Sequence, residues 1–282
     1  MLESTFLHMP GIGQRTERRL WREGVLHWQD ACAGGAGAAR CLSRHRAAEV
    51  SRHAAESLER LAAGDVRYFS DHLPSREHWR LFPEFRHCVA YVDIETTGLG
   101  APGDYITTIA LYDGRSVRHY VRGHNLEGFA DDVRRYDVIV TYNGKTFDVP
   151  WLRQAFGIPM DQAHVDLRYV LHSLGYKGGL KGCERQLGLE RGELEGIDGY
   201  FAVLLWRDFQ RSADPRALET LLAYNVQDVL NLETLMVRAY NMKLRETGCP
   251  AARELALDSA PANPFRPDRA TVERIRREHG WL

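Results

Sequence analysis

Three features of this sequence predict an α/β protein with one mixed sheet and an all-helical front region. Apolar side chains recur at helical spacing in residues 1–82, and short β-rich runs alternate with helical segments from residue 86 on. Tight turns such as "YDGRS" (112–116) join the first three runs, which indicates an antiparallel meander. Helical segments separate the later runs, which indicates parallel crossovers. A sheet that contains both the antiparallel meander and the parallel strands is therefore mixed.

Each element follows from a local pattern. The five candidate strands, rich in β-branched and aromatic residues, are 88–94, 105–112, 116–122, 137–142 and 163–167. The helices expected after residue 86 are 126–135, 148–156, 198–212 and 215–243. In the front region, Val50, Ala54, Leu58 and Leu61 form a helical stripe. The patch "ACAGGAGAAR" (31–40) favours a loop or a poor helix, and 73–85 reads as a bridge to the first strand.

Composition limits the class of protein. With 282 residues and 44% hydrophobic content, the chain can bury a sizeable core, with room for two domains. A net charge of −1 gives no global basic excess. Five scattered cysteines without C-x-x-C spacing favour free thiols and a reducing compartment. Neither an apolar run of about 18 residues nor a signal pattern occurs, so we expect a soluble cytoplasmic protein without a membrane partner.

Two carboxylates interrupt the first strand, "CVAYVDIETTGLG" (88–100). Asp93 and Glu95 are two residues apart, so their side chains point to one face of the strand, just before a turn at Gly98. Like charges this close repel, and burial increases the cost. The pair therefore needs a partner of opposite charge.

Two further acids accompany this pair. Asp148 lies at the expected start of a helix in "DVIVTYNGKTFDVPWL" (137–152), where a helix N-cap is an equally good interpretation. Asp228 falls within the apolar stripe of the helix "ALETLLAYNVQDVLNLETLM" (217–236), and Tyr224 lies one turn earlier on the same side.

No obvious cation accompanies these acids, since Lys145 could reach only one of them. Four hard oxygen ligands suit Mg²⁺ or Mn²⁺. They converge only if the strand at 88–94 lies beside the strand at 137–142, as the mixed sheet implies.

The segments "DIETTGL" (93–99), "YNGKTFD" (142–148) and "YNVQD" (224–228) resemble the three motifs of DEDD-type 3′→5′ exonucleases with a ribonuclease H-like fold. The second and third motifs are most similar to the proofreading domain of family B DNA polymerases. As a whole, the chain is most similar to small bacterial YprB-type ribonuclease H-like proteins. The resemblance covers about 86–243 and implies a ribonuclease H-like mixed five-stranded sheet.

The resemblance implies roles for individual residues. Asp93, Glu95, Asp148 and Asp228 would hold two divalent metal ions, Mg²⁺ or Mn²⁺, for phosphodiester hydrolysis. Tyr224 would orient the attacking water. A sister subclass has His where Ala223 stands here, so the chain resembles the tyrosine subclass, called DEDDy.

The resemblance also implies substrate contacts. Asn143 and Phe147 would line the path of a single strand, and Leu99 would wedge against the terminal base. Asp166 matches a recurrent acid at a strand end, and a helix cap is an equally good interpretation. Apart from the resemblance, "YKGGLKGCERQLG" (176–188) places two lysines near a helix start, which either touch the substrate backbone or belong to a glycine-loosened loop before a helix.

A second resemblance lies in "MPGIGQRTERRL" (9–20), which is similar to a helix-hairpin-helix. Gly11 and Gly13 would present backbone N–H groups to a DNA phosphate, and Arg15 and Arg19 would add charge. The alternative is a glycine-capped turn without a ligand. Trp21 and Trp28 are expected in the core, and His164 and His172 are expected to be structural.

The expected domains are a helical region with the hairpin (1–82), a ribonuclease H-like exonuclease domain (83–245), and a linker with a C-terminal helix (246–282). The leading hypothesis is a metal-dependent 3′→5′ exonuclease acting on single-stranded DNA ends. Its rivals are a 3′→5′ exoribonuclease, a nucleic-acid-binding module with a vestigial site, and a scaffold that docks a partner through its front region. The sequence identifies no protein partner.

Overall fold

One mixed sheet organises the protein, for which the computed structural model describes residues 1–33, 36–257 and 261–281. Its strand order is β3-β2-β1-β4-β5. The strands are β1 (Val89–Thr96), β2 (Ile106–Tyr112), β3 (Val117–Val121), β4 (Val138–Thr141) and β5 (Ala163–Asp166). β1, β2 and β3 pair antiparallel, whereas β1, β4 and β5 pair parallel. The predicted meander, the parallel crossovers and the pairing of the first and fourth strands are confirmed.

Helices make up most of the remaining described chain. The α-helices are α1 (Gln14–Arg22), α2 (Trp28–Cys32), α3 (Ala36–Cys41), α4 (Arg44–Ala62), α5 (Val66–His72), α6 (Phe82–Phe85), α7 (Phe129–Val133), α8 (Asp148–Phe156), α9 (Leu167–Ser173), α10 (Gly179–Gln186), α11 (Gly199–Ser212), α12 (Pro215–Thr247) and α13 (Arg269–Glu278). Short 3₁₀ helices are η1 (Leu2–Ser4), η2 (Ser75–Leu81), η3 (Arg86–Cys88), η4 (Leu126–Gly128) and η5 (Gly192–Leu194). None of the described helices has the length and apolar composition needed to cross a bilayer.

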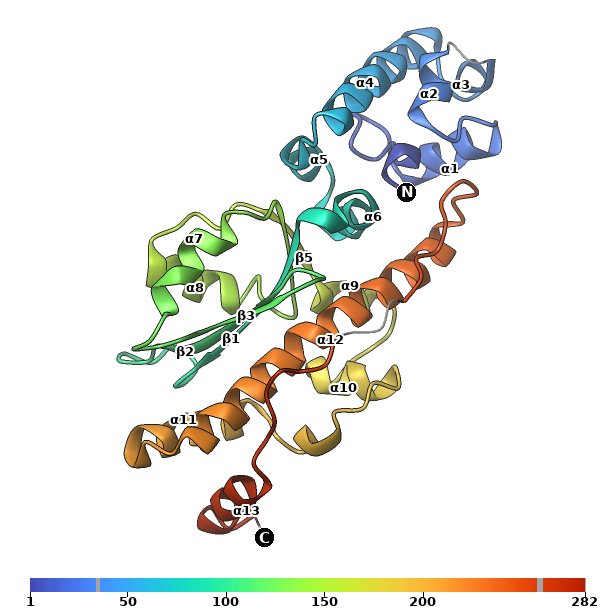
Figure 1. The fold of residues 1–282 in the computed structure, drawn as a ribbon. Helices are drawn as coiled ribbons and strands as arrows, with labels where there is room; N and C mark the ends of the chain where they lie inside the picture. The colour runs from blue at the N-terminus through green and yellow to red at the C-terminus, as the bar shows by residue number, and fades with distance from the viewer. Residues whose placement is uncertain (34–35, 258–260, 282) are drawn as a thin grey trace.

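Helices cover both faces of the sheet (Figure 1). α7 and α8 pack on one face, against side chains such as Val92 and Ile139. The long helix α12 crosses the other face, where Val89 and Tyr91 belong to its core. Because side chains alternate along a strand, the odd-numbered residues of β1 face α12. This alternation turns the end of β1 that carries Asp93 and Glu95 toward α12.

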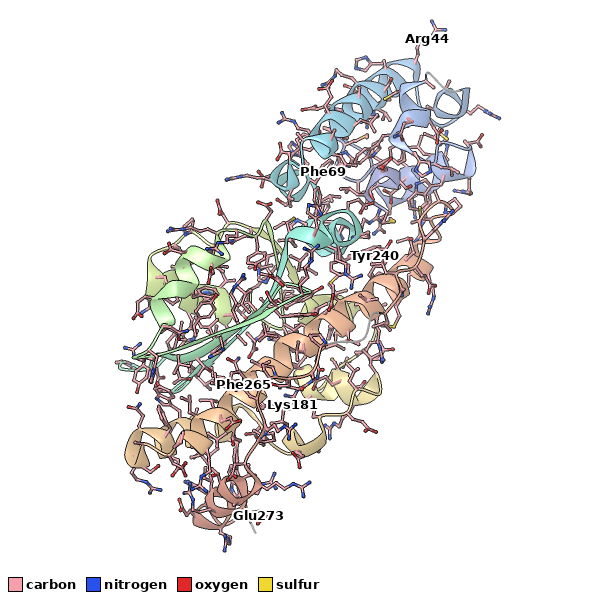
Figure 2. All side chains as sticks on the ribbon, viewed as in Figure 1. Arg44, Phe69, Lys181, Tyr240, Phe265 and Glu273 are labelled. Atoms are coloured by element: carbon pink, nitrogen blue, oxygen red, sulfur yellow. The ribbon has the colours of Figure 1, made fainter. Side chains whose placement is uncertain are left out.

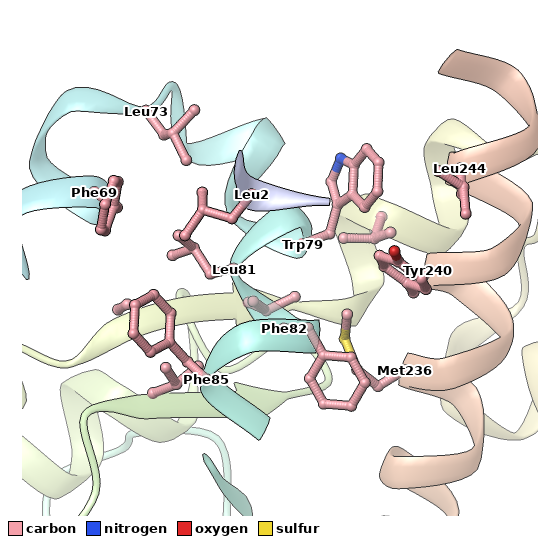
Figure 3. Close-up of a cluster of buried hydrophobic side chains, with 14 of the residues drawn as sticks. Leu2, Phe69, Leu73, Trp79, Leu81, Phe82, Phe85, Met236, Tyr240 and Leu244 are labelled. Atoms are coloured by element: carbon pink, nitrogen blue, oxygen red, sulfur yellow. The ribbon is translucent and has the colours of Figure 1, made fainter. Parts of the chain in front are cut away.

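The front region packs against the C-terminal half of α12 (Figure 3). There the ring of Trp79 lies 5.8 Å from that of Tyr240, centroid to centroid. The indoles of Trp21 and Trp28 are buried and donate to the carbonyls of Ser4 and Thr5, so the core assignment of both tryptophans is confirmed.

Two segments of the front region that the sequence left loosely defined contain short helices. The patch at 31–40, expected to be a loop or poor helix, contains the end of α2 and most of α3, although residues 34 and 35 lie outside the described part. The bridge at 73–85 is helical and largely buried. Its Arg80 is only 2% exposed and lies between Glu17 and Glu77. We call these three residues the Arg80 cluster.

The "PGIG" turn leads directly into α1. Gly11 has a positive φ of 71°, and Gly13 is the N-cap of the helix. Before the turn, η1 is the only helical segment described. The guanidinium of Arg46, from α4, donates to the carbonyls of Pro10 and Gly11. The turn is therefore fixed from one side by a neighbouring helix.

Candidate active site

Three carboxylates meet where β1 ends beneath α12. Asp93, Glu95 and Asp228 each offer an oxygen, and these oxygens all lie within 4.8 Å of one another. Glu95 and Asp228 are buried, and Asp93 is partly exposed. The alternation of β1 and the apolar stripe of α12 account for the convergence, because both point these side chains into one interface. We call these three residues, together with Asp148, the acid cluster.

Asp148 approaches from the other side of β1. The parallel ladder between β1 and β4 ends at the pair Tyr91 and Val140, so the two strands separate before Asp93. The Asp148 carboxylate accepts the N–H of Ile94, at 3.2 Å. Phe147 is the N-cap of α8, which has no side-chain capping bond. The capping alternative for Asp148 is therefore wrong, because its side chain turns toward β1.

Asn225 orients the first carboxylate of the cluster. Its side-chain amide donates to Asp93 Oδ2 at 2.7 Å, and its amide oxygen accepts the hydroxyl of Thr108, from β2. Asn225 is fully buried. Asn225 was not among the residues predicted for the site, although a polar side chain inside an apolar helical stripe, next to Tyr224, was a usable signal.

The loop before α8 depends on two local constraints. Asn143 adopts a positive φ of 68°, and a Cβ at Gly144 would lie 2.2 Å from Thr141 Oγ1, so that position requires glycine. The carboxylate of Asp166 accepts the N–H groups of Asn143 and Lys145, at 2.8 and 3.0 Å.

Asp166 also caps the following helix. It accepts the N–H of Arg168, at 3.0 Å, as the N-cap of α9. The capping interpretation is confirmed. One carboxylate thus joins the end of β5 to the loop that leads to Asp148.

Tyr224 lies one turn before Asp228 on the buried side of α12. The ammonium of Lys181, from α10, donates to its hydroxyl and lies 4.2 Å from the centre of its ring. Figure 2 shows Lys181 on α10, beside α12. Because the hydroxyl oxygen accepts from Lys181, its own proton remains available to a third group.

Arg191 corrects the expectation that the acids lack a cationic partner. Its guanidinium donates to Asp228 Oδ1 and, at 2.9 and 2.8 Å, to both oxygens of Glu184. Glu184 is fully buried and accepts a further bond from Asn231, at 2.7 Å. No sequence signal pointed to the ion pair between Arg191 and Asp228. The two residues are 37 positions apart, and Arg191 lies in a segment that connects two helices. Lys145, the cation considered from the sequence, lies by Asp166 instead.

Electrostatic repulsion persists despite Arg191. Burial first, and then the charge of Asp228, raise the pKa of both Asp93 and Glu95 well above the ordinary range. Burial likewise raises the pKa of Asp148 to about 7. No hydrogen bond to the Glu95 carboxylate occurs within the described residues. The acid cluster therefore holds more negative charge than its protein surroundings neutralise.

This donor set fits divalent metal ions. Clustered, partly desolvated carboxylate oxygens are the ligands that Mg²⁺ and Mn²⁺ prefer. A cation between them would offset the repulsion that raises their pKa values.

The other residues expected at the site lie in two places. Leu99 is 92% exposed on the loop after β1, and Asn143 and Phe147 are partly buried in the loop before α8. The four residues expected to contact a phosphate in the front region, all exposed, are Gly11, Gly13, Arg15 and Arg19.

The front hairpin lies far from the acid cluster. Arg18, on α1, donates to the carbonyl of Glu246, near the end of α12. With a rise of 1.5 Å per residue, Glu246 lies about 27 Å along the helix from Asp228. The hairpin therefore does not converge on the acid cluster.

Comparison with known families identifies the fold. A family model described as the RNase H superfamily matches residues 90–240, which carry all four acids and Tyr224. The chain belongs to the RNase H superfamily. Membership supports a nuclease, and hence a nucleic-acid substrate, and RNase H-like nucleases use divalent metals.

Two individual proteins are similar to this RNase H superfamily member. The uncharacterized protein YprB of Bacillus subtilis is 31% identical over 185 residues, which make up 57% of this chain and 44% of YprB. The chain thus spans less than half the length of this relative. Among solved structures, the family B DNA polymerase of Pyrobaculum calidifontis is 25% identical, with a TM-score of 0.42 over 56% of this chain and 24% of the polymerase.

Proposed function

We propose that this protein is a metal-dependent 3′→5′ exonuclease of the DEDDy type that hydrolyses single-stranded DNA from its ends. The observation that carries the proposal is the convergence of Asp93, Glu95 and Asp228, with oxygens within 4.8 Å of one another, beside Tyr224. These residues belong to three motifs in the order that DEDD-type exonucleases have. The direction of cleavage is taken from that resemblance.

The acids would hold two metal ions. Asp93, Glu95 and Asp228 would supply ligands for one ion, and Asp93 with Asp148 would supply ligands for the other. When bound, the ions would supply Lewis-acid activation of water and stabilise the leaving 3′ oxygen. Asn225 fixes the orientation of Asp93, and Arg191 fixes that of Asp228.

Tyr224 positions water and does not act as a base in this mechanism. Burial, with the charges of Asp228 and Glu95, raises its pKa well above the ordinary value, so its hydroxyl keeps its proton. The oxygen accepts from Lys181, and the O–H is left to orient an attacking water. Leu99 would contact the terminal base, and Asn143 and Phe147 would contact the strand.

The front hairpin would add a DNA contact of its own. Gly11, Gly13, Arg15 and Arg19 are exposed, and Arg46 donates to the carbonyls of Pro10 and Gly11. This contact would supply affinity without sequence preference.

One degradation assay tests the proposal. A 5′-labelled single-stranded DNA, the matching duplex and an RNA of the same sequence are incubated with Mg²⁺, Mn²⁺ or EDTA. The proposal expects a ladder of shortened, still labelled DNA products with either metal and none in EDTA. Release of a labelled mononucleotide as the first product would contradict the direction of cleavage. Hydrolysis undiminished by EDTA would contradict the metal site, and degradation of RNA alone would indicate the exoribonuclease.

A further inference from the structure

Two hollows lie on either side of α9, next to the candidate active site. Tyr169 and Ser173, one turn apart, line a hollow of about 230 Å³ together with Lys145. Arg168 and His172, on the neighbouring side of the helix, line a hollow of about 560 Å³. The exposed side of α9 is therefore a ridge between two depressions.

The side chains around this ridge carry unpaired positive charge. Within the described residues, Lys145, Arg168 and Lys177 have no carboxylate within 4.0 Å, whereas Lys243 pairs with Glu246 at 2.7 Å. Asp166, which carries the single carboxylate among the lining residues of the two hollows, is 3% exposed and already accepts three backbone N–H groups. In a chain of net charge −1, this concentration of unpaired cations favours a polyanion as ligand.

An exposed aromatic ring lies among these cations. Tyr169 is 51% exposed, although tyrosine carries a large apolar ring. Tyr142 and Tyr176 line the larger hollow. Their hydroxyls point inward, to Cys183 and Met242. Aromatic rings between cations are typical of surfaces that stack the bases of a single strand while binding its phosphates.

Two segments that line the larger hollow lead along the chain to residues of the candidate active site. Asn143 forms part of its wall, and the loop from Asn143 leads to Asp148 at the start of α8. On the opposite wall, Lys177 lies four residues before Lys181, whose ammonium donates to Tyr224. Both walls thus lead to residues of the proposed active site.

We propose that Lys145, Arg168, Tyr169, His172 and Lys177, which we call the α9 track, bind the single-stranded DNA that extends 5′ of the nucleotide being removed. Arg168 and Lys177 contact phosphates, and Tyr169 stacks on a base. This inference rests on the proposed function, because it assigns the path of that substrate.

Binding without catalysis tests the track. A labelled single-stranded DNA 20-mer is titrated with the full-length protein in EDTA, and affinity is measured by fluorescence anisotropy at several salt concentrations. The variants are Arg168→Ala with Lys177→Ala, and Tyr169→Ala alone. The matched control is Arg115→Ala with Arg134→Ala, which removes two exposed arginines at the end of the sheet where β1 begins. Thermal unfolding verifies that each variant is folded.

The expected results separate charge from stacking. Loss of two phosphate contacts should make the slope of log K against log salt shallower by about 1.4. Tyr169→Ala should weaken single-strand binding about tenfold and leave duplex binding unchanged, since stacked bases are unavailable in a duplex. The control variant should bind as wild type does.

The outcomes distinguish the track from the activity. If both track variants bind as the control does, while the wild type degrades DNA, the track is wrong and the proposed function stands. If the track variants lose affinity but the wild type degrades no nucleic acid, the track stands and the proposed function is wrong.

Discussion

Two buried groups of charged side chains, on different parts of the molecule, differ in how fully their charges are paired. In the Arg80 cluster, Arg80 donates to Glu77 at 2.8 Å and to both oxygens of Glu17 at 3.1 Å. The Glu17 carboxylate also accepts the backbone N–H of Phe6, and the Glu77 carboxylate also accepts the side-chain amide of Gln14. In the acid cluster, Glu95 has no hydrogen-bond donor within the described chain. Two cations, Arg191 and Lys181, face the acids there.

The difference indicates what each group does. Burial raises the pKa of Glu17, but Arg80 and Phe6 oppose that effect. A paired and hydrogen-bonded group of this kind fixes α1, through Glu17, against η2 within the front region. The acid cluster instead keeps carboxylates whose pKa values are raised by burial and by one another, a cost that a protein tolerates where function requires it. A divalent cation would complete the acid cluster, whereas the Arg80 cluster needs none.

The largest expected effect compares the two arginines. Arg80→Ala and Arg191→Ala each leave two buried carboxylates without their partner, so each should lower the free energy of unfolding of the metal-free protein by roughly 3–5 kcal/mol. Mg²⁺ should restore part of the loss for Arg191→Ala, because a cation can replace the guanidinium beside Asp228. Urea unfolding with and without Mg²⁺ measures both losses. If Mg²⁺ restored the free energy of unfolding equally in Arg80→Ala and Arg191→Ala, the two clusters would not differ in their response to a metal ion.

Tyr224→Phe tests the positioning role of the hydroxyl. The variant should lower kcat by about 10²–10⁴-fold with little change in KM, since positioning of a reacting group is worth about that much. Stability should hardly change, because the ring stays packed. Single-turnover degradation of labelled single-stranded DNA measures the effect. An unchanged rate of the chemical step would make Tyr224 a packing residue.

Neutralising one carboxylate in each cluster should have opposite effects on stability. Asp93→Asn removes a repelled charge and should raise the free energy of unfolding of the metal-free protein at pH 8, while turnover is lost. In Glu77→Gln, an uncharged amide replaces the carboxylate that accepts from Arg80 and Gln14, and its NH₂ group cannot accept a hydrogen bond. This variant should therefore lower the free energy of unfolding by roughly 1–3 kcal/mol. Denaturant unfolding in EDTA gives both values, and a loss of stability in Asp93→Asn would contradict the account.

The last expected effect is a difference in pH dependence. Burial raises the pKa of Asp148 from 3.8 to about 7, so its native form keeps a proton that the unfolded chain loses. Its contribution to stability is present below about pH 4 and is lost as pH rises to about 7. Burial lowers the pKa of His8, in the front region, from 6.5 to about 3, so stability falls as pH drops below 6.5.

Two variants separate these contributions. Asp148→Asn should flatten the neutral side of the metal-free stability profile, and His8→Gln should flatten the acidic side. Unfolding in urea at intervals from pH 4 to pH 8, in EDTA, provides the profiles. If both variants keep the wild-type profile, these two groups do not set the pH dependence.

The sequence predicted the parts of the site that depend on local pattern. Alternation in β1 and the helical stripe of α12 were sufficient to bring Asp93, Glu95 and Asp228 together, once β1 lay beside β4. The burial of Trp21 and Trp28 also followed from local rules. For Asp148 the sequence left two interpretations open, because a first-turn aspartate fits a cap and a ligand equally.

The sequence could not predict contacts that depend on how loops return to the sheet. Arg191 is one arginine among many in the chain, and only the path between α10 and α11 brings it to Asp228. Arg80 lies in a segment that reads as a bridge, and its burial depends on Glu17, 63 residues away. Charged residues give no periodic signal of burial when their partners come from distant segments.

A metal titration followed by thermal unfolding tests the central claim that divalent cations complete the acid cluster. At pH 8, MnCl₂ is added to the wild type, to Asp93→Asn and to Glu77→Gln, and the shift in Tm is measured. The wild type should be stabilised as binding saturates, by about 2.7 kcal/mol at a hundred times Kd. Glu77→Gln should show the same shift from a lower starting Tm, and Asp93→Asn should show none. A shift in Asp93→Asn equal to that of the wild type would contradict the claim.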